Sequence, residues 1–346
     1  MNTFERIDLQ LFAHADPFVP GTTPGTPNVN PVNVSTQSSM EPTIKTFYDT
    51  TLLENYREEN IFGQFAQKTE IKGSKAEWRK FNKFDKAIAP LKEGVIPSGQ
   101  DFGMTKLEVS TTQHGSYTAV SDVLEMDAYD DIIFGATEEM GASAGETKDY
   151  LTRNVLDETM SVYYAPIVSS DGAVTEVKAE NSITADAKVT PEVIARVATD
   201  LRKAKAPRID GSYVALIHPS TAHDIRQSSD FKEFHKYAAT TEIFNGEIGE
   251  LHGVRFVLST ACKVSKTGAS GAAVYNTYVI GKDAYGEVTP EGGDMEMIIK
   301  GKEYGGPLNQ YSTIGYKFRH AAKVLYPERI IIIKSGSSYS AIDEAN

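Results

Sequence analysis

The segment 133–164 constrains the fold more than any other part of the sequence, because its pattern predicts one long amphipathic helix. Apolar or small residues recur there mostly at steps of three and four, the spacing of a single helical face. They are Ala136, Met140, Ala144, Thr147, Leu151, Val155 and Val162. About 30 residues at a rise of about 1.5 Å each give a rod of roughly 45 Å, longer than most globular helices. Pro166 is expected to end it.

The opposite face of this predicted helix is strongly acidic. The acidic residues of the region are Glu125, Asp127, Asp130, Asp131, Glu138, Glu139, Glu146, Asp149, Asp157 and Glu158, whereas its basic residues are Lys148 and Arg153. A rod with one apolar face and one negative face indicates a scaffold that receives a basic partner. We expect Glu138, Glu139, Glu146 and Asp149 to contact that partner.

Length and charge narrow the functional classes. A chain of 346 residues can bury a large core, and the usual domain size predicts about two domains. The net charge of −12 argues against a general nucleic-acid binder, which needs clustered Lys and Arg. The single cysteine, Cys262, excludes a disulfide framework within the chain. No apolar run approaches the roughly 18 residues of a membrane span, and the acidic start is unlike a signal peptide, so we expect no membrane partner and cytosolic synthesis.

The first 71 residues predict an arm followed by a short helix. Residues 16–46 are rich in Pro, Gly, Thr, Asn and Ser and have no periodicity, so they cannot bury enough apolar surface to fold alone. We interpret residues 1–46 as an extended N-terminal arm, either disordered or laid across a neighbour. The apolar face expected for the helix consists of Leu52, Leu53, Tyr56, Ile61, Phe62 and Phe65.

Residues 72–117 predict a long two-stranded ribbon that extends from the body. The outgoing strand is basic with interleaved aromatic residues, although the aromatic spacing of three also fits a helix. Such a composition suits a platform for single-stranded nucleic acid, or docking on an acidic surface. We prefer docking of the ribbon on the acidic helix of another copy. The candidate contact residues are Lys75, Trp78, Arg79, Lys80, Lys83, Lys86 and Lys92.

Residues 186–300 alternate between helix and strand patterns and predict an α/β unit. Thr190 is the expected N-cap of its first helix, with Pro191 at the first helical position. A second helix is expected after Pro219, and a turn at 244–246. The predicted strands are 213–217, 254–258, 274–280 and 295–299. The later apolar run 330–333 predicts a buried strand that pairs with distant residues, which makes the first domain discontinuous.

No group of residues has the pattern of an enzyme, cofactor or metal site. Two groups invite such an interpretation: His218, Ser220, His223 and Asp224, and the acidic residues Glu291, Asp294 and Glu296. The first group stands at a strand-to-helix junction, where Ser and Asp normally cap a helix. The second is typical of a solvated turn. We therefore predict a protein that is not an enzyme and has no cofactor.

Several segments, taken in their order, resemble the tailed-bacteriophage major capsid proteins, within which the chain looks most like the branch of the phage N-four major coat protein. The matching segments are Leu9-Gln10-Leu11-Phe12-Ala13, Tyr213-Val-Ala-Leu-Ile-His-Pro-Ser-Thr221, Gly246-Glu-Ile-Gly-Glu-Leu-His-Gly-Val-Arg-Phe-Val257 and Tyr278-Val-Ile-Gly-Lys-Asp-Ala-Tyr285. The resemblance implies an α+β, HK-ninety-seven-like fold. Its parts would be the arm (1–46), an extended loop (72–117), an axial domain (186–300) and a peripheral domain (47–71, 118–185 and 301–346) that holds the spine helix.

The resemblance also implies a function and partners. Such proteins assemble as hexamers and pentamers into an icosahedral shell around double-stranded DNA, in a virion capsid built in the host cytoplasm. Portal and scaffolding proteins are the further expected partners, and the DNA is expected to lie near the shell without sequence-specific binding. The alternatives are another virion protein, such as a tail or decoration protein, and an α/β enzyme.

Overall fold

The computed structural model describes residues 60–346, except positions 87, 89, 91–92, 95, 97–98, 128–131, 169–172, 229–248 and 305. Four predictions fall outside the described residues: the arm 1–46, the part of the short helix before Asn60, the turn at 244–246 and the contact residue Lys92. The other predictions can be compared with the structure.

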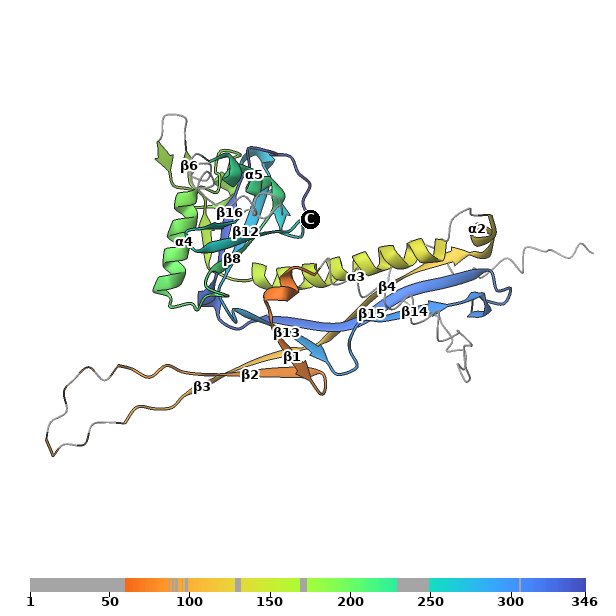
Figure 1. Cartoon of the computed structure of the whole chain (residues 1–346), viewed down its shortest axis with the longest axis horizontal. Helices are drawn as coiled ribbons and strands as arrows, with labels where there is room; N and C mark the ends of the chain where they lie inside the picture. Colours follow the sequence, from red (N-terminus) through yellow and green to blue (C-terminus); the bar gives the residue numbers. More distant parts are fainter. Residues whose placement is uncertain are drawn as a thin grey trace, which may run out of the picture.

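One five-stranded sheet lies under the long helix α3 (Ile132–Asp157), as Figure 1 shows. Its strands are β1 (Gln67–Ile71), β13 (Tyr285–Pro290), β15 (Tyr311–Val324), β14 (Glu296–Lys300) and β4 (Thr112–Ser121). The 14-residue β15 pairs with β13, β14 and β4 and runs along the helix. The predicted apolar face packs on this strand: Met140 and Ala144 contact Tyr316 in one apolar cluster.

The long helix ends earlier than the sequence predicts. It stops at Asp157, and Val162–Tyr164 form a strand, β5, in place of two further helical turns. Val162 is β-branched and the two tyrosines are aromatic, so these residues favour a sheet, and a sheet edge is available beside them. Asp157 fixes the end of the helix, because its Oδ1 accepts hydrogen bonds from Asn276 Nδ2 (3.0 Å) and Tyr278 Oη (2.7 Å).

The second sheet has seven strands, and helices lie beside it (Figure 1). Its strands are β5, β16 (Ile330–Ser335), β12 (Val274–Ile280), β8 (Tyr213–Ile217), β10 (Val254–Leu258), β9 (Glu250–Leu251) and β11 (Val264–Ser265). Helix α4 (Pro191–Lys203) begins after Thr190, whose side chain accepts a hydrogen bond from Val193 N as predicted. Helix α5 (Pro219–Gln227) follows β8, also as predicted.

The predicted domain boundary at residue 300 does not separate the two sheets, because each sheet contains strands from both sides of it. Strands β13 and β14 lie within the range 186–300 but pair with β15 of the five-stranded sheet. Conversely, β16 lies within 301–346 but pairs with β12 and with β5, far back in the sequence. The expectation that the last strand pairs with distant residues is thus met, whereas the range 186–300 does not coincide with one sheet. No strand was expected over β13, because Gly286 and Pro290 are unusual in strands.

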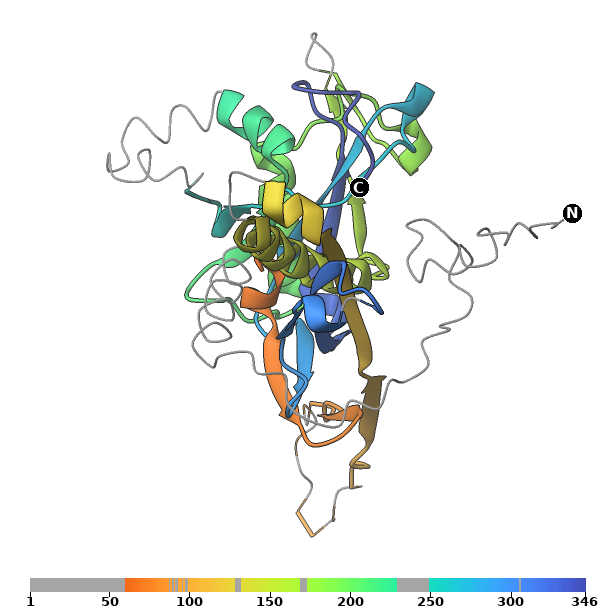
Figure 2. The same ribbon diagram turned by 90° about the vertical axis from the view of Figure 1, so that its right-hand side faces the viewer.

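The ribbon consists of β2 (Lys75–Phe81) and β3 (Met104–Ser110), paired antiparallel from Lys75–Ser110 to Phe81–Met104. The helical alternative for the outgoing segment is therefore wrong. Figures 1 and 2 show the ribbon projecting away from both sheets. Small elements complete the described chain: α2 (Asp122–Asp127), the hairpin of β6 (Ile167–Val168) and β7 (Val174–Thr175), and 3₁₀ turns at Phe62–Phe65, Glu180–Ser182, Ala269–Gly271, Lys302–Tyr304 and Pro327–Arg329.

Candidate functional site

The base of the ribbon is packed on its own chain. Ala76 and Trp78 of β2 form an apolar cluster with Val288 and Ala321 of the five-stranded sheet. Trp78 lies so close to Gly286 that a Cβ there would stand 2.8 Å from Trp78 Cζ2. Trp78, a predicted contact with another subunit, therefore packs within its own subunit through part of its side chain, and its contact with a neighbour stays a prediction.

Two of the predicted basic contacts pair within the subunit. Lys80 Nζ lies 3.2 Å from Glu328 Oε1 and 4.2 Å from the centre of the Tyr326 ring. Arg79 Nε donates to Glu77 Oε1 at 2.7 Å, and Lys106 Nζ reaches the other oxygen of Glu77. These bonds from Lys106 and Arg79 lower the pKa of Glu77. Arg79 and Lys80 are thus partly neutralised, whereas Lys75, Lys83 and Lys86 are exposed.

Beyond its base, the ribbon carries exposed stacked aromatic rings. The Phe81 and Phe102 centroids are 4.8 Å apart, and those of Phe84 and Phe102 are 5.6 Å apart. These three residues form the phenylalanine stack, and Phe81 is 58% exposed, Phe84 57% and Phe102 63%. Apolar surface of this size in water favours burial against a partner. The sequence showed the aromatic residues but not that they meet, because Phe102 is 18 or more positions from the other two.

The long helix keeps three of its four predicted contact residues on the outside. Glu138, Glu139 and Glu146 are exposed. Asp149 is only 1% exposed and accepts hydrogen bonds from Ile61 N (2.9 Å) and Phe62 N (3.1 Å). Burial raises the pKa of Asp149 from 3.8 to about 7, although the two backbone N–H groups lower it. Asp149 therefore fastens the start of the described chain to the helix and is not a surface contact.

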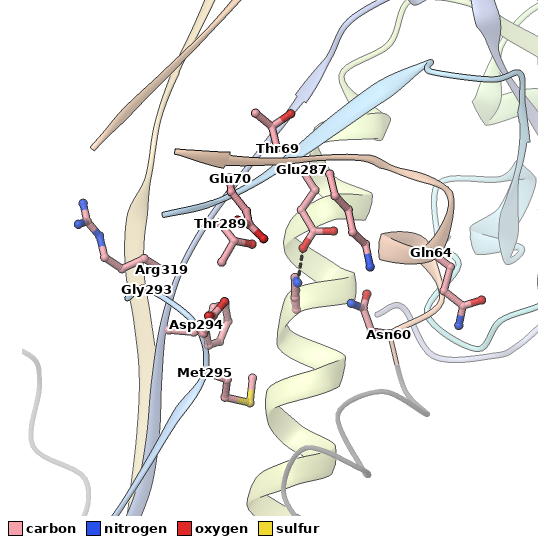
Figure 3. A pocket seen from close by; sticks show the side chains of 13 residues that line it. Asn60, Gln64, Thr69, Glu70, Glu287, Thr289, Gly293, Asp294, Met295 and Arg319 are labelled. Atoms are coloured by element: carbon pink, nitrogen blue, oxygen red, sulfur yellow. Dashed lines mark ion pairs between the residues drawn. The ribbon is translucent and has the colours of Figure 1, made fainter. Parts of the chain in front are cut away.

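A cluster of three polar residues, Glu287, Lys148 and His320, lies beside Asp149 and next to a pocket of 580 Å³ (Figure 3). Glu287 of β13, 2% exposed, forms an ion pair with Lys148 of the helix. His320 Nδ1 is 3.6 Å from the same carboxylate, and its Nε2 is 3.3 Å from Thr152 Oγ1. Burial, together with the charge of Lys148, lowers the pKa of His320 to about 3, so this imidazole is neutral at pH 7.

The other titratable groups have structural roles. His218 is the N-cap of α5, and its Nδ1 accepts a hydrogen bond from Ser220 N at 3.2 Å. The predicted capping role of this group is confirmed, although the capping residue is His218 and not a Ser or Asp. Asp224 accepts a hydrogen bond from Ser338 N (3.0 Å). Burial raises the pKa of the Cys262 thiol, which disfavours the reactive thiolate. Among the described residues, no group of three His, Cys, Asp or Glu side chains is placed to hold a metal ion.

Within the described part of the chain, none of the helices combines the length and apolarity needed to cross a bilayer.

Comparison with known proteins identifies the family. The sequence profile described as "Phage capsid protein" matches residues 105–333, about two-thirds of the 346-residue chain. The chain belongs to the phage capsid protein family. This match covers β3 of the ribbon, the long helix and most strands of both sheets. A search of curated proteins gives no match.

Solved structures show that the fold is that of phage capsids. The capsid of cyanophage P-SCSP1u is 17% identical with a TM-score of 0.61, over 81% of this chain and 89% of that one. The capsid of Ralstonia phage GP4 is 14% identical with a TM-score of 0.60, over 82% and 89%. The cyanophage Pam1 capsid is 14% identical with a TM-score of 0.56, over 78% of this chain and 86% of that one. The expected HK-ninety-seven-like fold is thus confirmed, and the protein is a structural protein of the phage capsid. The N-four branch stays a prediction.

Proposed function

We propose that this capsid protein assembles with its own copies, as hexamers and pentamers, into an icosahedral shell around double-stranded DNA. In this assembly the ribbon of one subunit lies across the long helix of the next. The observation that carries the proposal is the contrast between the two surfaces. The phenylalanine stack is flanked by exposed Lys83 and Lys86, whereas the helix exposes Glu138, Glu139 and Glu146.

Apolar burial supplies most of the expected binding free energy, and charge supplies the orientation. An exposed ion pair contributes about 0.2–1 kcal/mol, so a few pairs alone do not hold a subunit. Burial of the three rings adds about 25 cal/mol for each Å² of apolar surface removed from water. A subunit in a lattice makes several such contacts at once, and this multivalency makes modest contacts sufficient.

Further partners follow from the charge balance and the family. A subunit with a net charge of −12 does not attract DNA strongly, so the packaged DNA stays mobile beside the shell. Portal and scaffolding proteins are the other expected partners, with assembly in the host cytoplasm. A purely structural role, without catalysis, agrees with the roles found for His218, Asp224 and Cys262.

Reversal of charge on the ribbon tests the docking. We expect Lys83→Glu with Lys86→Glu to prevent shell assembly while the subunit stays folded, because both side chains are exposed. The control is Lys203→Glu on α4, a helix that is not part of the ribbon, whose side chain is 75% exposed. Electron microscopy of the concentrated proteins gives the readout. Normal shells from the double variant would refute the docking, and tubes or rings from the unaltered protein would indicate a tail protein.

A further inference from the structure

Strand β5 leaves one edge of the seven-stranded sheet open. It is the end strand of the sheet and pairs only with β16 among the described strands. Ser161 O accepts from Ile332 N and Ala165 N donates to Lys334 O, both at 2.9 Å. Backbone groups alternate in direction along a strand, so those of residues 162 and 164 point away from β16. In particular, the N–H and C=O of Tyr164 face the open side.

A groove of 790 Å³ runs beside this open edge. Its walls are β5, the β6–β7 hairpin and the start of α4. Val168 and Val174 of the hairpin line it and are 41% and 60% exposed. Arg196 Nη1 donates to the Tyr163 hydroxyl at 3.3 Å on the α4 side. An open strand edge beside a groove with apolar side chains in its wall is the arrangement that binds an extended peptide as an added strand.

The same chain contains a segment with the matching pattern. Residues 7–13 place apolar side chains at every second position: Ile7, Leu9, Leu11 and Ala13. The segment contains no proline, so each of its N–H groups can join a ladder, unlike the Pro-rich residues that follow it. Residues 14–59 then connect it to Asn60. A fully extended chain spans about 3.3 Å per residue, so this connection reaches on the order of 150 Å, enough to cross to an adjacent subunit.

We propose that residues 7–13 of a second copy bind in this groove as a strand added to β5. The Ile7, Leu9 and Leu11 side chains pack between the hairpin valines and α4, and the outward groups of Tyr164 bond to the added backbone. The inference rests on the proposed assembly, because assembly brings the segments of neighbouring copies to this groove at high effective concentration. It gives each subunit a second link to its neighbours, made by main-chain hydrogen bonds and independent of the ribbon.

Cross-linking between two kinds of subunit tests the proposal. Full-length chains with Leu11→Cys are co-assembled with full-length chains carrying Val174→Cys, and the shells are treated with a bismaleimide. The natural Cys262 is 0% exposed and does not compete for the reagent. We expect linked dimers of the two kinds of chain, identified by mass spectrometry of the joined peptides. The matched control is Gln10→Cys in place of Leu11→Cys, which points to the opposite face of a strand and should link several-fold less.

Each outcome decides between the alternatives. A preference for Leu11→Cys over Gln10→Cys supports the proposal, and its loss when Val168→Glu is added to the Val174→Cys chain strengthens it. Equal linking by the two variants overturns it. A chain carrying both Leu11→Cys and Val174→Cys that links only to itself also overturns it, because the arm then occupies its own groove. Shells that form without specific linking leave the proposed function intact, whereas the absence of shells from unaltered protein contradicts that function.

Discussion

Asp149 shows how one buried carboxylate joins the start of the described chain to the long helix. Its two oxygens accept hydrogen bonds from Ile61 N and Phe62 N. Phe62 itself is fully buried and its ring meets Tyr278 edge-on at 5.5 Å. The carboxylate therefore holds an apolar residue in position between the helix and the seven-stranded sheet. The sequence pattern placed Asp149 on the outer face because it could not show a second covered face of the helix.

The first prediction concerns the hydrogen bonds of Asp149. We expect Asp149→Ala to lower the free energy of unfolding by about 1–3 kcal/mol, because one buried and one partly buried N–H group lose their acceptor. Asp149→Asn should cost less, since the amide oxygen still accepts one bond. Urea denaturation of the unassembled subunit measures both. Glu146→Ala is the control. It removes an exposed carboxylate of the same helix and should change the free energy of unfolding by less than about 0.5 kcal/mol. An equal loss in all three variants would contradict this role.

The second prediction concerns pH, where Asp149 and His320 act in opposite directions. The folded pKa of Asp149 (about 7) exceeds its unfolded value, so its contribution is present below about pH 4 and is lost as pH rises to 7. The folded pKa of His320 (about 3) is below its unfolded value, so its contribution is present above about pH 6.5 and is lost as pH falls to 3. The two nearly cancel in the unaltered protein.

Single substitutions separate these two dependences. With Asp149→Asn, the free energy of unfolding should rise between pH 4 and 6.5, since His320 alone remains. With His320→Gln, it should fall between pH 4 and 7, since Asp149 alone remains. Each slope should approach about 1.4 kcal/mol per pH unit. Denaturation series at several pH values measure the slopes, and the same slope in both variants would show that other groups dominate.

At the scale of the elements, the ribbon base depends on close packing of β2 on β13. Gly286 leaves room for Trp78, since a Cβ would approach Trp78 Cζ2 to 2.8 Å and Leu325 Cδ1 to 3.3 Å. We expect Gly286→Ala to cost about 1–3 kcal/mol, as overpacked sites do. Gly135→Ala in the long helix, with open space at its Cβ among the described residues, should instead stabilise by up to about 1 kcal/mol. Thermal denaturation of both variants checks the contrast in sign.

The elements that the sequence predicted well are those with local signals. Thr190 and Pro191 mark the start of α4, and the apolar runs of β8 and β12 mark buried strands. The elements that it missed depend on distant partners. Strand β13 contains Gly286 and Pro290, which weaken any local strand signal, yet β1 and β15 pair with it from both sides. The helix end at Asp157 depends on the same kind of distant contact.

In the candidate site, too, the sequence predicted the features with local signals and missed those that depend on distant partners. Charge and aromatic content identified the ribbon, and Lys75, Lys83 and Lys86 are exposed as an interaction surface requires. The sequence did not show that Trp78 and Lys80 have partners within their own subunit, because these partners, Gly286 and Glu328, are more than 200 residues away in the sequence. The phenylalanine stack likewise depends on the pairing of two strands. Patterns within one segment therefore locate a surface but do not show which of its residues are already occupied.

At the scale of the whole molecule, the proposed docking joins two surfaces of one chain, the ribbon and the long helix, from different copies. The ribbon extends away from the sheets, so it does not cover the helix of its own subunit (Figure 1). In the proposed ring of identical subunits, every ribbon faces the helix of the next subunit, so a change on either surface is repeated at each contact. A second change on the facing surface can therefore restore all contacts at once.

The last prediction uses this repetition. Lys83→Glu with Lys86→Glu should prevent assembly, and so should Glu139→Lys with Glu146→Lys, because like charges then face each other at every contact. A single chain with all four substitutions should recover shells, since each contact regains opposite charges with the sign reversed. Shells are counted by electron microscopy, after circular dichroism has shown that each variant is folded. Recovery requires that these surfaces meet. Assembly that stays lost in the fourfold variant, while that protein remains folded, would show that the ribbon docks elsewhere on its neighbour.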